Sequence, residues 1–188
     1  MPQAKTFTPK ELRRVLDYVA TRKHAIRNRT MILMTHLAGL RVGEVAYLKF
    51  SDVVDEAGAV RYEIRLSPEQ TKGDRSRVVF ISDRLRKEIS VYLGVYKVSS
   101  PNASLFYTQK RTAFTPNTLC QTLNVIYREA GIHGATSHSG RRSFITALAA
   151  KGVSVRVLAA LAGHRSISTT QAYIDVNDEM KRAAVELL

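Results

Sequence analysis

The spacing of apolar residues predicts helices along most of the chain. The first helical pattern follows a start signal in which Thr8 is the cap, Pro9 is the first helical residue and Glu11 completes a capping box. The second pattern ends near Gly39, where we expect a left-handed helix end. Further helical patterns run to Leu48 and over residues 82–96, 115–131, 139–151, 154–162, 168–175 and 178–188.

Two short segments instead have the pattern of β-strands. Residues 60–66 alternate between apolar and polar, and residues 78–81 form a β-branched and aromatic run. The sequence between them, Thr71-Lys72-Gly73-Asp74-Arg75, has the composition of a turn, which places Lys72 at or beside a hairpin turn. We therefore predict an α+β domain that is mainly α-helical and contains a small antiparallel sheet.

Composition and charge restrict the class of protein. The 188 residues are 45% apolar and contain no division into separate units, so we expect one domain with a core over about 8–176 and a helical tail over 178–188. Lys and Arg number 29 against 16 Asp and Glu, a net charge of +13 that favours a polyanionic partner. Cys120 is the single cysteine, which excludes an intramolecular disulfide and fits a reducing, cytoplasmic location. No apolar run has the length of a membrane span.

The C-terminal part gathers phosphate-binding and proton-transferring side chains. Taken one at a time they have ordinary interpretations: a solvated basic helix end for His138 and Arg141, a polar loop residue for His164, and core filling for Tyr173. Arginine nevertheless suits phosphate because its planar fork donates two parallel hydrogen bonds, and a helix N-terminus adds positive potential. The candidates of this region are His138, Arg141, Arg142, His164, Arg165 and Tyr173.

Four segments, in one order, resemble the signatures of the tyrosine recombinase (phage integrase) family. The resemblance extends over about 8–176, nearly the whole chain. It implies that family's catalytic-domain fold, with a three-stranded antiparallel sheet. The four segments are Leu37-Ala38-Gly39-Leu40-Arg41-Val42-Gly43-Glu44-Val45, Thr71-Lys72-Gly73, Ser137-His138-Ser139-Gly140-Arg141-Arg142-Ser143-Phe144 and residues 161–173, which begin Leu161-Ala162-Gly163-His164 and end at Tyr173.

The resemblance implies one active site and an enzymatic activity. That activity is site-specific recombination, in which DNA is cleaved and rejoined through a 3′-phosphotyrosyl intermediate with neither metal nor cofactor. Fixed cations would stabilise the charge that builds on the phosphate in the transition state. The implied catalytic residues are Arg41, Lys72, His138, Arg141, His164 and Tyr173.

The resemblance also implies a role for each side chain. Tyr173 would attack the phosphorus while the two arginines stabilise the developing charge, and a histidine, with His138 preferred, would help to remove the phenolic proton. Lys72 would protonate the leaving 5′-oxygen, and His164 would hydrogen-bond a non-bridging oxygen. Because the hairpin is the least regular of the four segments, Lys49 and Lys87 stay open as alternatives to the lysine.

Neighbouring residues add one expected partner and two departures from the family. Glu44 lies three residues after Arg41, and we interpret it as orienting that arginine or its helix. Gly140 stands where many relatives carry leucine, and Arg142 where many carry histidine. These departures bear on local packing more than on chemistry.

The expected partner is double-stranded DNA, on which about four copies would assemble at paired sites. The tail over 178–188 has an apolar face that a neighbouring copy could cover, and accessory DNA-bending proteins are a further class of partner. Family members commonly carry a separate helical domain before the segment that begins at Phe7. Its absence predicts either a short recombinase, which we favour, or a catalytic domain cut from a longer protein.

Two other functions are consistent with parts of the sequence. A type IB topoisomerase would use the same nucleophile and cations to nick and reseal one strand. A non-enzymatic DNA-binding module would use residues 153–175 as a helix-turn-helix. The sequence does not reveal the DNA target, nor does it distinguish integration, excision, inversion and resolution.

Overall fold

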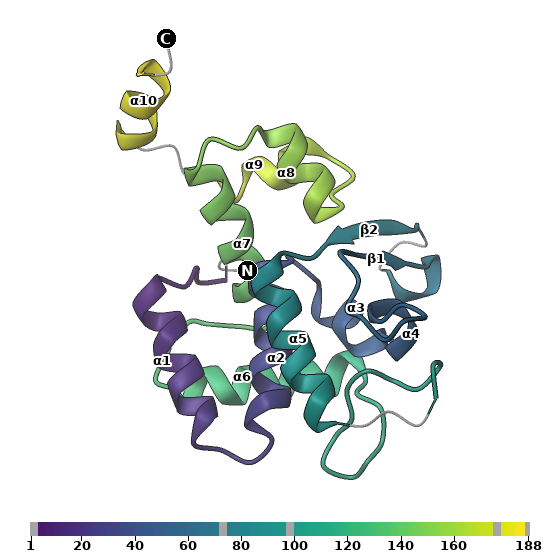
Figure 1. The fold of residues 1–188 in the computed structure, drawn as a ribbon. Coiled ribbons are helices and arrows are strands. Elements are labelled where there is room, and N and C mark those ends of the chain that lie inside the picture. The colour runs from purple at the N-terminus through teal and green to yellow at the C-terminus, as the bar shows by residue number, and fades with distance from the viewer. Residues whose placement is uncertain (1–3, 72–74, 97–99, 175–177, 187–188) are drawn as a thin grey trace.

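The computed structural model describes residues 4–71, 75–96, 100–174 and 178–186. Within them the chain is mainly helical, with one small sheet and a helix close to the C-terminus (Figure 1). The elements are α1 (Pro9–Ala20), α2 (Ala25–Leu37), α3 (Val42–Tyr47), α4 (Phe50–Val53), β1 (Glu63–Leu66), a 3-10 turn (Pro68–Gln70), β2 (Arg77–Phe80), α5 (Asp83–Val95), α6 (Pro116–Glu129), α7 (Ser139–Ala150), α8 (Val155–Ala162), α9 (Ile167–Gln171) and α10 (Asp178–Val185).

Helix α2 is the centre of the core. It packs against α1, α3, α5 and α7, and four consecutive side chains, residues 31–34, are fully buried. Four consecutive residues point to all sides of a helix, so burying all four requires other elements around it, as there are here. The site described below depends on α2 because the turn at its C-terminal end leads directly into α3.

The predicted helix signals are confirmed at the start of α1 and at the end of α2. The Thr8 side chain accepts from the Glu11 backbone N–H, the Glu11 carboxylate accepts from the Thr8 N–H, and Pro9 opens α1. Gly39 follows α2 with a φ of 62°, the left-handed conformation that the sequence predicts. An added Cβ at Gly39 would lie 2.5 Å from the Phe144 ring, so this turn is also a close contact with α7.

The sheet has two strands within the described residues, which corrects the three-stranded sheet that the resemblance implies. β1 and β2 are antiparallel, with Leu66 opposite Arg77 and Glu63 opposite Phe80. The segment before β1 contributes only an isolated bridge between Val54 and Val60. Pairing stops there because a tight turn, with the Asp55 N–H donating to the Ala59 carbonyl at 2.9 Å, closes the loop at once. The hairpin turn at residues 72–74 lies outside the described residues.

Helix α7 leads from α2 in the core to α8 and α9, which lie at one end of the molecule, where α8 contacts β2 (Figure 1). Helix α9 is shorter than the predicted 168–175 and ends at Gln171, so Tyr173 lies in the turn that follows it. Helix α10 stands apart from the other helices (Figure 1). None of the helices in the described ranges is long and apolar enough to cross a membrane.

Candidate active site

Arg41 enters the site from the turn between α2 and α3. It is the N-cap residue of α3, and Glu44 accepts from both its backbone N–H at 2.7 Å and its Nη1 at 2.8 Å. Burial alone would raise the pKa of the Glu44 carboxyl, but hydrogen bonds and charge from Arg77 and then Arg41 outweigh it and lower that pKa. The expectation that Glu44 orients Arg41 is therefore supported by a fully charged, 1% exposed carboxylate.

Arg141 reaches the same place from α7. Its guanidinium donates to the Gly39 carbonyl at 2.5 Å and to the Ala162 carbonyl. Burial, with repulsion from Arg41 and Arg77, lowers the pKa of Arg141 to about 9, which still leaves it protonated at neutral pH. A Cβ on Gly140 would collide with the Thr35 hydroxyl of α2, so the glycine found where many relatives carry leucine lets α7 lie closer to α2.

The C-terminal end of α8 is where the arginines meet. The last carbonyls of a helix have no intrahelical partner and carry the negative end of its dipole, so they attract cations. Three consecutive carbonyls each accept from a different arginine, with donor–acceptor distances of 2.9 Å for Arg77 and 3.0 Å for Arg41. The pairs are Leu161 with Arg77, Ala162 with Arg141, and Gly163 with Arg41.

His164 comes directly after Gly163, which ends α8 in a left-handed conformation with φ of 63°. Its Nδ1 lies 2.9 Å from the Thr170 hydroxyl of α9. Burial, then the positive charges of Arg141, Arg41 and Arg77, lower the pKa of His164 to about 4. His164 is therefore neutral at physiological pH, and one ring nitrogen is free of a proton.

Tyr173 lies against His164. The two rings are stacked at 22° with centroids 5.7 Å apart, and the Arg142 guanidinium is 5.5 Å from the Tyr173 ring centroid. The Tyr173 backbone is held by its N–H to the Thr170 carbonyl at 2.9 Å and by its carbonyl, which accepts from the Thr146 hydroxyl at 3.2 Å. Arg142, the second departure from the family, thus packs beside the candidate nucleophile.

The structure does not bring all the predicted residues together. The His138 side chain is exposed at the start of α7, one helical turn before Arg141, and its ring makes no hydrogen bond, ion pair or ring contact with the other described candidates. Lys72 lies outside the described residues, so its placement stays a prediction. Lys49 and Lys87, the open alternatives, are exposed on α4's cap and on α5, and neither lines the cavity at the arginines.

That cavity, of about 590 Å³, lies between the hairpin and the α8–α9 turn. Sequence reasoning missed one of its charged residues, Arg77. The available signal was the alternation of β2, because Arg77 lies on the same face as the buried Val79 and an inward-facing arginine needs a partner. The residues that line the cavity are Arg41, Thr71, Arg75, Ser76, Arg77, Gly163, His164, Arg165 and Thr169.

The charges paired at the end of α8 do not balance among the described residues. Arg41, Arg77 and Arg141 supply three positive charges there and Glu44 supplies one negative charge, a surplus of 3 − 1 = +2. A phosphodiester brings one negative charge, and its pentavalent transition state brings about two. Among the described residues, no cluster of His, Cys, Asp and Glu could hold a metal ion.

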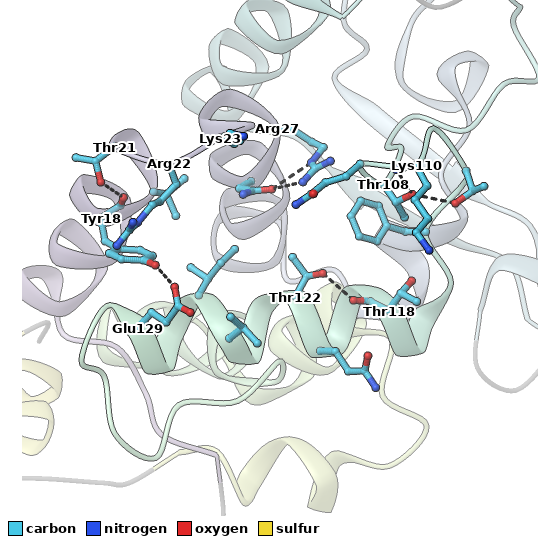
Figure 2. Close-up of a pocket in the computed structure, with 18 residues that line it drawn as sticks. Tyr18, Thr21, Arg22, Lys23, Arg27, Thr108, Lys110, Thr118, Thr122 and Glu129 are labelled. Carbon is cyan, nitrogen blue, oxygen red and sulfur yellow. Dashed lines mark hydrogen bonds between the residues drawn. The ribbon is translucent and has the colours of Figure 1, made fainter.

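A second, larger hollow is separate from this site. It measures about 960 Å³ and lies between the end of α1, the start of α2, α6 and the loop over 108–114 (Figure 2). Tyr18 bonds to Glu129 at one end, and Arg22, Arg27 and Lys110 line the hollow (Figure 2). None of the described candidate catalytic residues lines it.

Comparison with known proteins agrees with this geometry. The model of the phage integrase family matches residues 5–180. The chain belongs to this family. It is 33% identical over 185 residues to the tyrosine recombinase XerA of Pyrococcus furiosus, covering 97% of this chain and 61% of that protein. It is 34% identical over 189 residues to XerA of Thermococcus kodakarensis, covering 97% and 62%.

Solved structures show the same fold. A crystal structure of XerA recombinase superposes with a TM-score of 0.78 at 26% identity, covering all of this chain and 66% of that one. XerH bound to its difH substrate before cleavage has a TM-score of 0.68 at 26% identity, covering 96% and 53%. The predicted tyrosine recombinase catalytic-domain fold is thus confirmed, and the chain spans about three fifths of the length of the curated relatives it matches.

Proposed function

We propose that this chain is the catalytic domain of a site-specific recombinase that cleaves and rejoins double-stranded DNA. The observation that carries the proposal is the convergence of Arg41, Arg141, His164 and Tyr173 around the end of α8, where the described arginines exceed Glu44 by two positive charges. The names of its relatives support it, since those proteins are tyrosine recombinases and XerH is seen with its DNA substrate. The chain's net charge of +13 suits the same partner.

Cleavage would be a single transesterification. The Tyr173 oxygen attacks the phosphorus in line and forms a 3′-phosphotyrosyl bond, while the bond from phosphorus to the 5′-oxygen breaks and that oxygen keeps the electron pair. The phenolic proton would go to a base, for which the family resemblance prefers His138; its exposed ring would have to come within hydrogen-bond reach of Tyr173 when DNA binds. Lys72 gives a proton to the 5′-oxygen. Rejoining is the reverse reaction with another 5′-hydroxyl, so the bond energy is retained.

Charge stabilisation would come from groups that are already in place. Arg41 and Arg141 are fixed by carbonyls and by Glu44 before DNA binds, which is the arrangement in which donors stabilise a transition state most strongly. Neutral His164 would accept from the Thr170 hydroxyl at Nδ1 and donate from Nε2 to a non-bridging oxygen. Its low pKa keeps this donor in one protonation state across the physiological range.

Covalent capture tests the function and identifies the DNA site in the same experiment. A pool of nicked duplexes with randomised arms is incubated with the protein, adducts that survive denaturation are isolated, and their DNA is sequenced. We expect wild-type protein to enrich one inverted-repeat site and Tyr173→Phe to bind that site normally without forming an adduct. The matched control is Tyr47→Phe, because Tyr47 is 48% exposed and lies on α3, next to the site without contacting it.

Three outcomes would contradict the proposal. Adducts formed by Tyr173→Phe would remove the nucleophile assignment. Relaxation of supercoiled plasmids that lack the enriched site would indicate a topoisomerase. Sequence-specific binding with no adduct from wild-type protein would leave only a DNA-binding module.

The roles of Lys72 and the tail belong to the same proposal. A substrate with sulfur in place of the bridging 5′-oxygen needs no protonation, so it should restore cleavage in Lys72→Ala; continued failure would assign the acid to another residue.

For assembly, we propose a tetramer on paired sites in which α10, which stands apart from its own domain, contacts a neighbouring copy (Figure 1). Deleting residues 178–188 should preserve half-site binding and abolish cooperative occupancy and recombination. Normal recombination by that truncated protein would exclude this role.

A further inference from the structure

We propose that Arg77 is a positioning residue of this active site, which sets Arg41 through Glu44 and sets the turn before His164 through the Leu161 carbonyl. The inference rests on the proposed function. Arg77 opens β2, opposite Leu66 in the register of the two strands, so it joins β2 to the arginines.

The contacts of Arg77 connect two separate parts of the site. Nε and Nη2 donate to the two carboxylate oxygens of Glu44 at 2.9 and 2.6 Å, a bidentate pair. Nη1 donates to the Leu161 carbonyl at 2.9 Å, at the end of α8. A Cβ on Gly163 would lie 2.7 Å from Arg77 Cδ, so the aliphatic stem also packs directly on the turn that carries His164.

The physical effect on Arg41 follows from the sharing of one carboxylate. Glu44 is almost fully buried and pairs with both arginines. Without Arg77, its whole charge would act on Arg41, and the pair would hold the Arg41 guanidinium more strongly against the carboxylate and away from an incoming phosphate. Arg77 therefore keeps Arg41 aligned and leaves part of its charge available for the transition state.

Direct binding of phosphate by Arg77 is the main alternative. Its side chain is 10% exposed against 26% for Arg41, and each of its three nitrogens already donates to Glu44 or Leu161. Arg141 is similarly buried but donates only to neutral carbonyls, whereas the charge of Arg77 is paired bidentately with the Glu44 carboxylate and is less available to a phosphate. These observations favour positioning.

The first test uses Arg77→Gln and Arg77→Lys with the duplex enriched by covalent capture. We expect single-turnover adduct formation to slow by about 10- to 100-fold, since small misplacement of fixed catalytic groups has effects of that order, while the half-site dissociation constant changes by less than about threefold. Lysine should restore little of the rate because an ammonium cannot make the bidentate pair, although it keeps the charge opposite Glu44 and the packing on Gly163. The matched control is Arg65→Gln on β1, whose side chain is 81% exposed, and it should leave both measurements unchanged.

The second test separates positioning from phosphate contact. If Arg77 acts mainly through Glu44, the loss in the double variant Arg77→Gln/Glu44→Gln should be smaller than the product of the two single losses, and any loss beyond that of Glu44→Gln alone should be the small part due to the missing Leu161 contact. If Arg77 contacts phosphate, the two losses should multiply, which would overturn the inference. Normal cleavage by Arg77→Lys, or equal losses of binding and cleavage rate, would overturn it as well. Absence of an adduct from wild-type protein is a different result, because it contradicts the proposed function itself.

Discussion

The two sides of the active site are built differently. On one side is the arginine cradle, which we define as Arg41, Arg77 and Arg141 with Glu44 and the last carbonyls of α8. Its members come from α3, β2, α7 and α8, and each arginine is held by at least two hydrogen bonds to groups far away in the sequence or to Glu44. On the other side is the Tyr173 turn, residues 172–174, where Tyr173 is half-buried. Its carbonyl accepts a hydrogen bond from the Thr146 hydroxyl of α7, and its N–H donates to the Thr170 carbonyl.

The difference teaches which part of the chemistry is fixed before DNA binds. Donors that are already aligned stabilise transition-state charge without reorganisation, so the cradle benefits from rigidity. The nucleophile must attack at the correct moment. The Tyr173 ring packs on His164 and Arg142 but makes no hydrogen bond to the described residues, so it moves at lower cost than the paired arginines. We therefore expect cradle variants to lose chemistry strongly and turn variants to change it weakly.

The largest effect should come from removing an arginine side chain of the cradle. Arg41→Ala and Arg141→Ala should each slow adduct formation by about 10²- to 10³-fold or more, because each loses a donor that is worth roughly 3–4 kcal/mol or more in a site with little water. Half-site binding should weaken far less. Single-turnover cleavage and titration of the enriched duplex measure the two quantities, and equal losses would instead make these arginines phosphate anchors.

A smaller effect should come from distorting the turn that supports the cradle. Gly163→Ala places a methyl group against Arg77 at a φ of 63°, so it should destabilise folding by about 2–4 kcal/mol and slow cleavage. Gly152→Ala is the matched control, since Gly152 has a φ of 81° with nothing within 4 Å of an added Cβ. It should cost about 1 kcal/mol and leave the cleavage rate intact. Backbone strain is common to both variants, whereas collision with Arg77 affects only Gly163→Ala. Urea denaturation and adduct formation measure the two effects, and similar results for both variants would contradict the packing argument.

The same contrast explains what the sequence could predict. Local rules sufficed for the Thr8 cap, the Gly39 turn and most helix positions, because those signals lie within a few residues. The family signatures indicated Arg41, Arg141, His164 and Tyr173, and the structure brings these together. Arg77 was missed because its role depends on long-range contacts with Glu44 and α8, which no local pattern reveals.

The extent of the sheet and of α9 could not be predicted from local patterns. The strand-like residues before β1 form only one isolated bridge and do not continue as a third strand. Helix α9 ends two residues before Tyr173. Both boundaries depend on tertiary packing rather than on propensity.

The effect of the cradle's positive charges on the pKa of His164 should be measurable. In labelled protein, the His164 ring resonances should show no titration above pH 5, and Arg141→Ala should raise the pKa of His164 from about 4 towards its ordinary value, because part of the lowering comes from that positive charge. His36 is the matched control, since its pKa of about 4 results mainly from burial and then from Arg84. It should not change in Arg141→Ala, and a shift of both histidines would indicate general loosening.

The same two groups give the protein an acid-sensitive stability. Both histidines stay neutral in the folded protein but take up protons near pH 6.5 once it unfolds, so the stability they contribute is complete above that value. It should fall as the pH drops from about 6.5 towards 4. Urea denaturation at successive pH values checks this, and His36→Leu should reduce the slope in that window.

The smallest effect should come from the Tyr173 turn. Thr146→Val removes the hydroxyl that donates to the Tyr173 carbonyl at 3.2 Å, and the carbonyl can then bond to water because the turn is half-exposed. A neutral hydrogen bond of this kind is worth about 1 kcal/mol, so adduct formation should change by less than about fivefold. Thr122→Val is the matched control, since Thr122 also donates to a backbone carbonyl, that of Thr118 at 2.8 Å, but lies in the second hollow (Figure 2). It should leave cleavage unchanged. A loss in Thr146→Val as large as that of an arginine variant would mean that the Tyr173 turn is fixed as firmly as the cradle, and the proposed division of the site would be wrong.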